Sequence, residues 1–334
     1  MPLVVIAASV LWLLLTSCSS TPHNITEKYY LIVPNAKSPY WEEVVQGLNR
    51  AARELKVSVS LMGPDTYNSQ EQRDIFHKIA ASKPAGILVS VADPKLLTPE
   101  IDAAITAGIP VITVDSDAPE SKRLLFVGTN NYEAGQMGAR MAAKQLNGKG
   151  NVVAFLTRGQ ENMEERLSGY RKIFEAYPQI KIVEVVDIKG DPRIAFDRAN
   201  EILDKRKPEV DAFVSMEGQS AKEVAEVLRR HKPMTKVVIA MDTLAPTLEG
   251  IEQGLITATV AQKPFTMGYT SLRTIADLHL YKLANLQNDF RRNPHSPLPA
   301  FIDTGAALID KSSLAAYRAG RVEIATEKGS PPGS

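Results

Sequence analysis

The sequence predicts an α/β protein made of two doubly wound parallel-sheet domains. Short β-branched apolar runs such as Ile109–Val114 alternate with amphipathic segments such as Trp41–Leu55. This alternation is typical of parallel strands joined by helical crossovers. The pattern repeats in a second half that begins near residue 150, so the 334 residues suffice for two domains with a cleft between them.

The first half alternates apolar runs with helical segments. The runs lack polar alternation, which indicates strands that are buried on both faces. Within Trp41–Leu55, Val44, Leu48 and Leu55 share one face, as a helix packed on a sheet requires. We expect strands at 29–33, 57–61, 87–90, 109–114 and 124–127, and helices at 41–55, 70–81 and 99–107.

The second half repeats this rhythm and ends in a longer helix. We place that helix at 267–286, after Pro264, and the Pro- and Asn-rich residues 288–299 that follow suggest an exposed loop. The polar residues 326–334 suggest a disordered tail. We expect strands at 151–156, 181–186, 212–215, 236–240 and 255–260, and helices at 163–177, 192–204 and 220–231.

The N-terminus carries the features of an export signal. Residues 3–15 form an almost unbroken apolar run, too short to span a membrane but suited to a signal-peptide core. The small residues before Cys18 resemble a bacterial lipobox, in which cleavage precedes a cysteine that carries diacylglycerol. We therefore expect a signal peptide at 1–17 and a lipid-anchored tether at 18–27, which would hold the protein at a membrane surface outside the cytoplasm. An ordinary cleaved signal with an incidental Cys18 is the alternative.

Composition narrows the function classes. The formal net charge of +1 gives no basic footprint for nucleic acid. The single cysteine excludes an internal disulfide framework, and the five histidines show no metal-ligand spacing. We therefore predict no metal, no cofactor and no nucleic-acid partner.

Polar and aromatic side chains follow the predicted strands. In open α/β sheets, ligands bind beyond the carboxyl ends of the strands. Carboxylates, amides and arginine can bind the hydroxyls of a sugar, and aromatic rings can stack on its C–H face. A solvated turn for Asp115 and a core-anchoring role for Tyr40 and Trp41 are the alternatives. The candidate ligand-binding residues are Ser38, Tyr40, Trp41, Asp115, Ser116, Asn130, Asn131, Arg166, Glu217, Asp242 and Gln262.

A series of motifs resembles the periplasmic sugar-binding proteins of ABC importers, in the type I, ribose-binding-like group. The resemblance covers about 28–325, and its motifs are residues 35–41, 109–115, 129–135, 165–170, 241–242 and 254–264. It implies two lobes joined by a three-stranded hinge, which we place near 128–131, 261–263 and 299–304. The N-terminal lobe would comprise 28–129 plus 263–299, and the C-terminal lobe 130–262 plus 300–325.

The resemblance also implies which residues contact sugar. It transfers to Ser38, Tyr40, Trp41, Asp115, Asn131, Arg166, Asp242 and Gln262, and less directly to Ser116, Asn130 and Glu217. Three positions depart from the family pattern. Ser116 stands where arginine is frequent, Glu217 where asparagine or aspartate is frequent, and Gly190–Arg193 where an aromatic residue is frequent, so one wall of the sugar site is expected to be missing.

The resemblance implies a monomeric extracytoplasmic lipoprotein without catalytic residues. It would bind a monosaccharide or related polyol between two closing lobes and deliver it to an ABC permease. A receptor that presents its ligand to a sensor kinase or chemoreceptor would use the same chemistry. A carbohydrate-active enzyme would pair carboxylates among Asp115, Glu217 and Asp242. A sugar-responsive repressor is excluded, because an export signal occupies the place of a DNA-binding domain.

Overall fold

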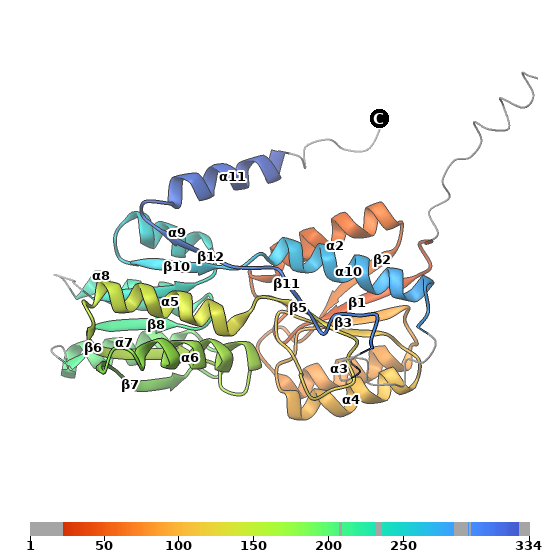
Figure 1. The fold of residues 1–334 in the computed structure, drawn as a ribbon, viewed down its shortest axis with the longest axis horizontal. Helices are drawn as coiled ribbons and strands as arrows, with labels where there is room; N and C mark the ends of the chain where they lie inside the picture. Colours follow the sequence, from red (N-terminus) through yellow and green to blue (C-terminus); the bar gives the residue numbers. More distant parts are fainter. Residues whose placement is uncertain (1–22, 207–208, 232–235, 284–292, 294, 327–334) are drawn as a thin grey trace, which may run out of the picture.

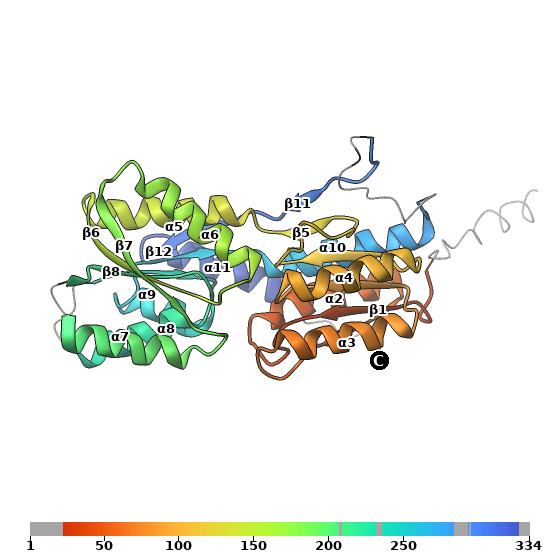
Figure 2. The same cartoon turned by 90° about the horizontal axis from the view of Figure 1, so that it is seen from below.

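The chain folds into two lobes that lie side by side along the long axis of the molecule (Figure 1). The computed structural model describes residues 23–206, 209–231, 236–283, 293 and 295–326. The lobes meet at a narrow waist (Figure 2). Over these described ranges, no helix combines the length and apolar character that crossing a membrane demands. The predicted signal peptide, Cys18 and most of the predicted tail lie outside them.

The N-terminal lobe is built on six parallel strands in the order β11–β5–β4–β3–β1–β2. Helices α2 and α10 cover one face and α3 and α4 the other (Figure 1). The strands are β1 (Lys28–Ile32), β2 (Ser58–Met62), β3 (Gly86–Val89), β4 (Val111–Val114), β5 (Phe126–Gly128) and β11 (Phe301–Asp303), and the helices are α2 (Trp41–Leu55), α3 (Ser69–Ala81), α4 (Pro94–Thr106) and α10 (Pro264–Leu280).

The C-terminal lobe repeats this plan in the order β12–β10–β9–β8–β6–β7, with β12 antiparallel to β10. Separate apolar clusters lie under α5 and α6 on one face and under α7 and α8 on the other. The strands are β6 (Lys149–Leu156), β7 (Gln179–Asp187), β8 (Ala212–Ser215), β9 (Val237–Met241), β10 (Ala258–Ala261) and β12 (Ala307–Asp310), and the helices are α5 (Asn131–Gln145), α6 (Glu161–Phe174), α7 (Arg193–Arg206), α8 (Ser220–Arg230), α9 (Ala245–Glu252) and α11 (Leu314–Thr326).

The central strands show why the apolar runs predicted this fold. Every residue of β3, β4, β8 and β10 is buried, as strands covered by helices on both faces must be. Two helix pairs then pack so closely that only glycine fits between them. A Cβ on Gly47 of α2 would lie 2.0 Å from the carbonyl oxygen of Phe265 on α10, and a Cβ on Gly135 of α5 would lie 2.1 Å from that of Arg166 on α6.

The structure adds elements that the sequence analysis does not predict. These are helices α5, α9 and α11 and the short edge strands β11 and β12. Glycine disfavours helix, so Gly135 and Gly138 weaken the helical signal of α5, although close packing against α6 requires them. Helix α4 begins at Pro94, earlier than predicted, because Asp93 accepts a hydrogen bond from the N–H of Lys95 and caps the helix ahead of Pro99.

Two boundaries also differ from the sequence prediction. Residues 23–27, assigned to the tether, pack on the N-terminal lobe: His23 is buried, and its ring bonds to Glu27, which also accepts from the hydroxyl of Tyr29. The third crossover lies between Asp303 and Ala307 instead of at 299–304, because β11 pairs with β5.

The crossovers are tied to one another at the waist. The N–H and the hydroxyl of Thr304 both donate to the carbonyl of Gly128, at 2.7 and 3.0 Å. The N–H of Asn130 donates to Asp303. The other connection runs from β10 through Gln262 and Lys263 into α10. A ligand that contacts these crossovers would bind the segments that connect the lobes, so its contacts would depend on how the lobes are placed relative to each other.

Candidate functional site

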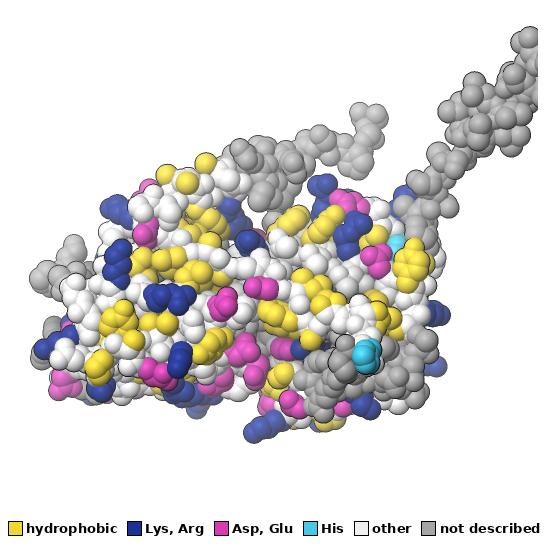
Figure 3. Space-filling view, in the orientation of Figure 1, with side chains coloured by type: hydrophobic (Ala, Val, Ile, Leu, Met, Phe, Trp, Pro, Cys, Tyr) yellow, Lys and Arg dark blue, Asp and Glu magenta, His cyan; other side chains and the backbone are white. Residues whose placement is uncertain are grey.

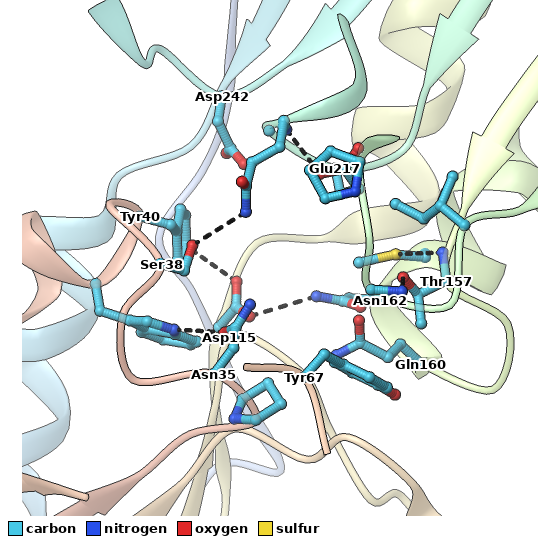
Figure 4. Close-up of a pocket in the computed structure, with 18 of the residues that line it drawn as sticks. Asn35, Ser38, Tyr40, Tyr67, Asp115, Thr157, Gln160, Asn162, Glu217 and Asp242 are labelled. Carbon is cyan, nitrogen blue, oxygen red and sulfur yellow. Dashed lines mark hydrogen bonds between the residues drawn. The ribbon is translucent and has the colours of Figure 1, made fainter. Parts of the chain in front are cut away.

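A cavity lies between the lobes, at the carboxyl ends of both sheets (Figure 4). The space that its lining side chains surround, counted together with the solvent at its open mouth, is about 670 Å³. Both lobes contribute polar and aromatic side chains. The residues that line it are Pro34, Asn35, Ser38, Tyr40, Trp41, Tyr67, Asp115, Thr157, Gln160, Asn162, Met163, Arg166, Ile188, Gly190, Pro192, Glu217, Gly218, Gln219, Asp242, Leu244 and Gln262.

Asp115 directly follows β4 and is the main polar group of the N-terminal lobe. Its carboxylate accepts from the Tyr40 hydroxyl at 2.7 Å, the Ser90 hydroxyl at 3.2 Å and Asn162 Nδ2 at 3.4 Å. Its φ of 66° is unusual for a residue with a Cβ and marks local strain. Burial raises the pKa of Asp115, while the nearby charge of Arg166 and the donors Tyr40 and Ser90 lower it.

Asp242 occupies the matching place after β9 in the C-terminal lobe. It too has a left-handed backbone, with a φ of 65°, and it accepts from Gln262 Nε2 at 2.8 Å. Burial raises the pKa of Asp242 to about 6, against the opposing effects of Arg166 and Gln262, and the charges of Asp115 and Glu217 add to the rise. Two buried carboxylates from opposite lobes therefore share one cavity.

Arg166 of α6 is the cation between them. Its guanidinium donates to Asn131 Oδ1 at 2.9 Å, to the carbonyl of Met216 at 2.6 Å and to Gln262 Oε1 at 3.0 Å. The side chain is almost fully buried. Arginine remains charged at all ordinary pH values, so this network fixes a positive charge at the centre of the site. The network also joins α5, α6 and the crossover after β10.

The aromatic pair at the start of α2 serves the cavity and the core together. The rings of Tyr40 and Trp41 meet edge to face, 5.0 Å apart. Trp41 is buried in the apolar core and donates from Nε1 to Asn35 at 3.0 Å, and it also lines the cavity. Burial and the charges of Asp115 and Asp242 raise the pKa of Tyr40 well above its usual value, so its hydroxyl remains a donor.

Eight of the eleven predicted ligand residues line the cavity: Ser38, Tyr40, Trp41, Asp115, Arg166, Glu217, Asp242 and Gln262. The other three do not. Ser116 is fully buried, with no hydrogen-bond partner for its hydroxyl among the described residues. Asn130 caps α5 by accepting from the N–H of Glu133, and Asn131 holds Arg166. These two act on the crossover and on the arginine.

Glu217 lines the cavity, but its carboxylate is engaged elsewhere. One oxygen accepts from the N–H of Gln219 and the other from that of Ser220, both at 2.7 Å. These are the unsatisfied donors at the start of α8, where a negative charge is favourable. The longer side chain thus bends back to cap its helix, which a sequence pattern does not reveal.

Several lining residues were absent from the prediction. Asn162 is buried against Asp115, and its Oδ1 has no partner among the described residues, so an acceptor faces the site. Its place in a polar stretch before a helix was a usable signal. Tyr67, in the loop after β2, had none. It lies against Gly190, so an aromatic ring from the opposite lobe stands beside the position where the wall was expected to be missing.

One side of the boundary between the lobes is acidic. On the face shown in Figure 3, Asp and Glu side chains gather where the lobes meet. Burial raises the pKa values of Glu161 and Glu165 at the start of α6, and the charge of Asp117 on the other lobe adds to both rises. The residues that line the cavity include three carboxyl groups and one cationic side chain, Arg166. Neutral, hydroxyl-rich molecules suit such a site better than anions.

The fold and this interlobe site define a two-lobed binding protein. Residues 29–282 match the family described as periplasmic binding protein domain, and the chain belongs to that family. It is similar to the D-allose-binding periplasmic protein of Escherichia coli, with 27% identity over 77% of this chain and 86% of the relative. The family name places proteins of this kind outside the cytoplasm.

Solved structures of sugar-binding proteins share the fold. GanP, a glucose-galactose binding protein from Geobacillus stearothermophilus, is 29% identical, with a TM-score of 0.78 over 86% of this chain and 99% of GanP. A solute-binding protein of an ABC transporter from Burkholderia graminis, solved in complex with D-arabinose, is 27% identical, with a TM-score of 0.79 over 88% of this chain and 98% of that protein. These relatives are named as binding proteins, not as enzymes.

Proposed function

We propose that this protein is an extracytoplasmic solute-binding lipoprotein that binds a neutral monosaccharide or related polyol between its lobes and delivers it to an ABC importer. The observation that carries the proposal is the interlobe cavity, in which Asp115 and Asp242 face the fixed charge of Arg166 beside Tyr40 and Trp41. The sugar-binding relatives support the same conclusion.

The polar groups of the site can support micromolar binding. A hydrogen bond to a charged group contributes about 1.5–3 kcal/mol. Asp115, Asp242 and Arg166 can each offer such bonds to hydroxyl groups, and Tyr40 and Trp41 add apolar contact. Micromolar affinity corresponds to about 8 kcal/mol, which equals three or four such hydrogen bonds at about 2–3 kcal/mol each.

Contacts that already bridge the lobes support closure around the ligand. Asn162 of α6 donates to Asp115 at 3.4 Å, and Gln219 Nε2 donates to the Ser38 hydroxyl at 3.5 Å. Arg321 of α11 forms an ion pair with Glu43 of α2. A sugar bonded to both lobes would add to these contacts only in the closed arrangement and would shift the population toward it.

A ligand panel tests the proposal. We expect D-allose, D-glucose, D-galactose or D-arabinose to raise the melting temperature of the purified protein, because a ligand of the native state stabilises it by mass action. Calorimetry should then show about 10- to 100-fold weaker binding in Asp115→Asn. Asp74→Asn, at an exposed site on α3, should bind like the native protein. If no neutral monosaccharide or polyol binds, the proposal is wrong.

Two further measurements address turnover and closure. Chromatography of the bound sugar after long incubation should recover it unchanged, whereas release of a product would indicate an enzyme. Small-angle scattering should show a smaller radius of gyration with ligand than without. An unchanged radius at saturating ligand would contradict closure.

The lipid anchor and the importer are tested in cells. Cys18→Ser should release the protein from the membrane fraction of a bacterial host, and mass spectrometry of the native protein should detect the acylated cysteine. Loss of sugar uptake on deletion of the gene, restored by the native chain, would support delivery to an importer. A soluble native protein would contradict the anchor without affecting the sugar site.

A further inference from the structure

The inner cavity lies next to an outer cleft, and six residues line both spaces. The outer cleft, counted together with the open solvent in it, has a volume of about 920 Å³, and its lining includes the ion pairs between Lys37 and Asp65 and between Arg193 and Asp191. The residues that line both spaces are Asn35, Ser38, Tyr67, Gly190, Pro192 and Gln219. These six shared residues therefore set what can extend from the inner cavity toward solvent.

On the C-terminal lobe, a tight turn after β7 contributes Gly190 to the shared residues. The N–H of Asp191 donates to the carbonyl of Ile188 at 2.8 Å, and Lys189 and Gly190 both have positive φ, at 52° and 76°. The N–H of Gly190 also donates to the Thr157 hydroxyl at 3.1 Å. The turn thus holds Gly190 at a fixed place on the rim, with no side chain toward the other lobe.

On the N-terminal lobe, Tyr67 fills the space that Gly190 leaves. A Cβ on Gly190 would lie 2.3 Å from Cβ and 2.9 Å from Cδ1 of Tyr67, so the two residues touch across the lobes. The Tyr67 hydroxyl donates to the carbonyl of Ala92 at 3.2 Å, which ties the ring to its own lobe. Figure 4 shows Tyr67 at the edge of the pocket away from Tyr40.

We propose that Tyr67 is a specificity-determining residue whose ring, seated against Gly190, closes the inner cavity and rejects sugars with a bulky substituent at the mouth. The inference rests on the proposed function. The contact joins residues of opposite lobes, so it is complete only when the lobes are closed. Without the aromatic ring of Tyr67, the inner cavity and the outer cleft become one continuous space that admits a longer ligand.

The test compares Tyr67→Ala, Tyr67→Phe and Tyr281→Ala by calorimetry. The probes are whichever of D-allose, D-glucose, D-galactose and D-arabinose binds the native protein, together with its methyl glycosides and a disaccharide that contains it. Tyr67→Ala should bind the free sugar about 10-fold more weakly, as truncation of an aromatic contact does. Its preference for the free sugar over the larger derivatives should fall at least as much. Tyr67→Phe keeps the ring and should stay within about threefold of native on both measures.

The outcomes separate this inference from the proposed function. Tyr281 is exposed at the end of α10, so Tyr281→Ala controls for loss of a surface tyrosine. If the native protein binds no sugar, both proposals fail. If it binds and Tyr67→Ala keeps the native affinity and preference, or if Tyr67→Phe loses as much as Tyr67→Ala, only this inference is overturned. Melting temperatures of the unliganded variants verify that each is folded.

Discussion

The two lobes place an aspartate in the same backbone setting and then surround it differently. Asp115 follows β4 and Asp242 follows β9, with φ values of 66° and 65°. Strand β4 is the third from the β11 edge of its sheet, and β9 is the third from the β12 edge of the other sheet. The N–H of each aspartate donates to the next strand, at Val127 and at Val260. Asp115 accepts side-chain bonds from Tyr40, Ser90 and Asn162, whereas Asp242 accepts one from Gln262. The two aspartates therefore share their backbone conformation and differ in the side chains that donate to them.

The helices beside the cavity repeat the same comparison. In the N-terminal lobe, α2 starts at the cavity and packs on α10, which starts at a crossover. In the C-terminal lobe, α6 starts at the cavity and packs on α5, which also starts at a crossover. The first pair carries aromatic rings into the site, and the second carries Arg166. The comparison indicates that the helix pair of the N-terminal lobe supplies apolar contact and a neutral donor, and that of the C-terminal lobe supplies the positive charge.

Removal of that charge should have the largest effect. Arg166→Met leaves two buried carboxylates without their cation and removes three hydrogen bonds. We expect a loss of about 3–5 kcal/mol in the free energy of unfolding at pH 8 and no measurable sugar binding. The loss should shrink at pH 5, where the carboxyl groups can take up protons. Denaturant unfolding at the two pH values measures both.

The matched control lies a few residues before Arg166 in the chain. Arg158 is half-exposed and pairs with Glu164, so Arg158→Met should cost less than about 1 kcal/mol and leave binding intact. Equal losses for the two variants would show that the central arginine has no special role. The electrostatic difference that we infer between the two lobes would then be wrong.

The sequence was sufficient for the parts of the site that depend on strand order. Parallel strands end at a common edge, so Asp242 and Gln262, which follow neighbouring strands of one sheet, could be placed together from apolar runs and the polar residues after them. Asp115 follows a strand of the other sheet, and the pattern of two domains with a cleft between them placed it opposite. The sequence was insufficient where tertiary contacts decide. The helix-capping geometry of Glu217, the role of Asn131 as a support for Arg166 and the approach of Tyr67 to Gly190 all depend on neighbours that are distant in the chain or on local backbone geometry.

The same limit explains the missed elements. The glycines of α5 are unfavourable for an isolated helix and are required only because α6 lies against them. Strand β11 has three residues and gains its structure by pairing with β5, far earlier in the chain. Its short length gives no periodic signal, so the third crossover was placed too early. Local pattern identifies the core, and contacts between distant segments fix the edges.

Asp242→Asn tests the aspartate that accepts fewer side-chain hydrogen bonds, through its effect on stability as the pH changes. The pKa is 3.8 for the ordinary carboxyl and about 6 in the folded protein. Between these values the folded state retains a proton that the unfolded state releases, so the contribution of Asp242 to stability falls as pH rises and stays low above pH 6. Below pH 3.8 both states are protonated and the contribution vanishes.

The asparagine variant should therefore gain stability over the native protein as pH rises from 4 to 6. The gain should level off at about 3 kcal/mol, since each pH unit is worth about 1.4 kcal/mol. Thermal or denaturant unfolding of both proteins across this range measures the difference, and Asp74→Asn provides the surface control. A difference that stays flat, or that falls with pH, would contradict an unfavourable buried charge at Asp242.

The glycine contacts test whether the two helix pairs are equivalent. Gly47→Ala and Gly135→Ala each place a Cβ within about 2 Å of a carbonyl oxygen on the neighbouring helix, so each should lower the free energy of unfolding by about 1–3 kcal/mol. Gly135→Ala pushes on the backbone of Arg166 itself, so it should also weaken sugar binding more than Gly47→Ala does. Gly320 of α11 has open space around its position, and Gly320→Ala should be neutral or stabilising by up to about 1 kcal/mol. Denaturant unfolding and calorimetry measure these effects, and a large loss from only one of the two packed glycines would end the equivalence of the lobes.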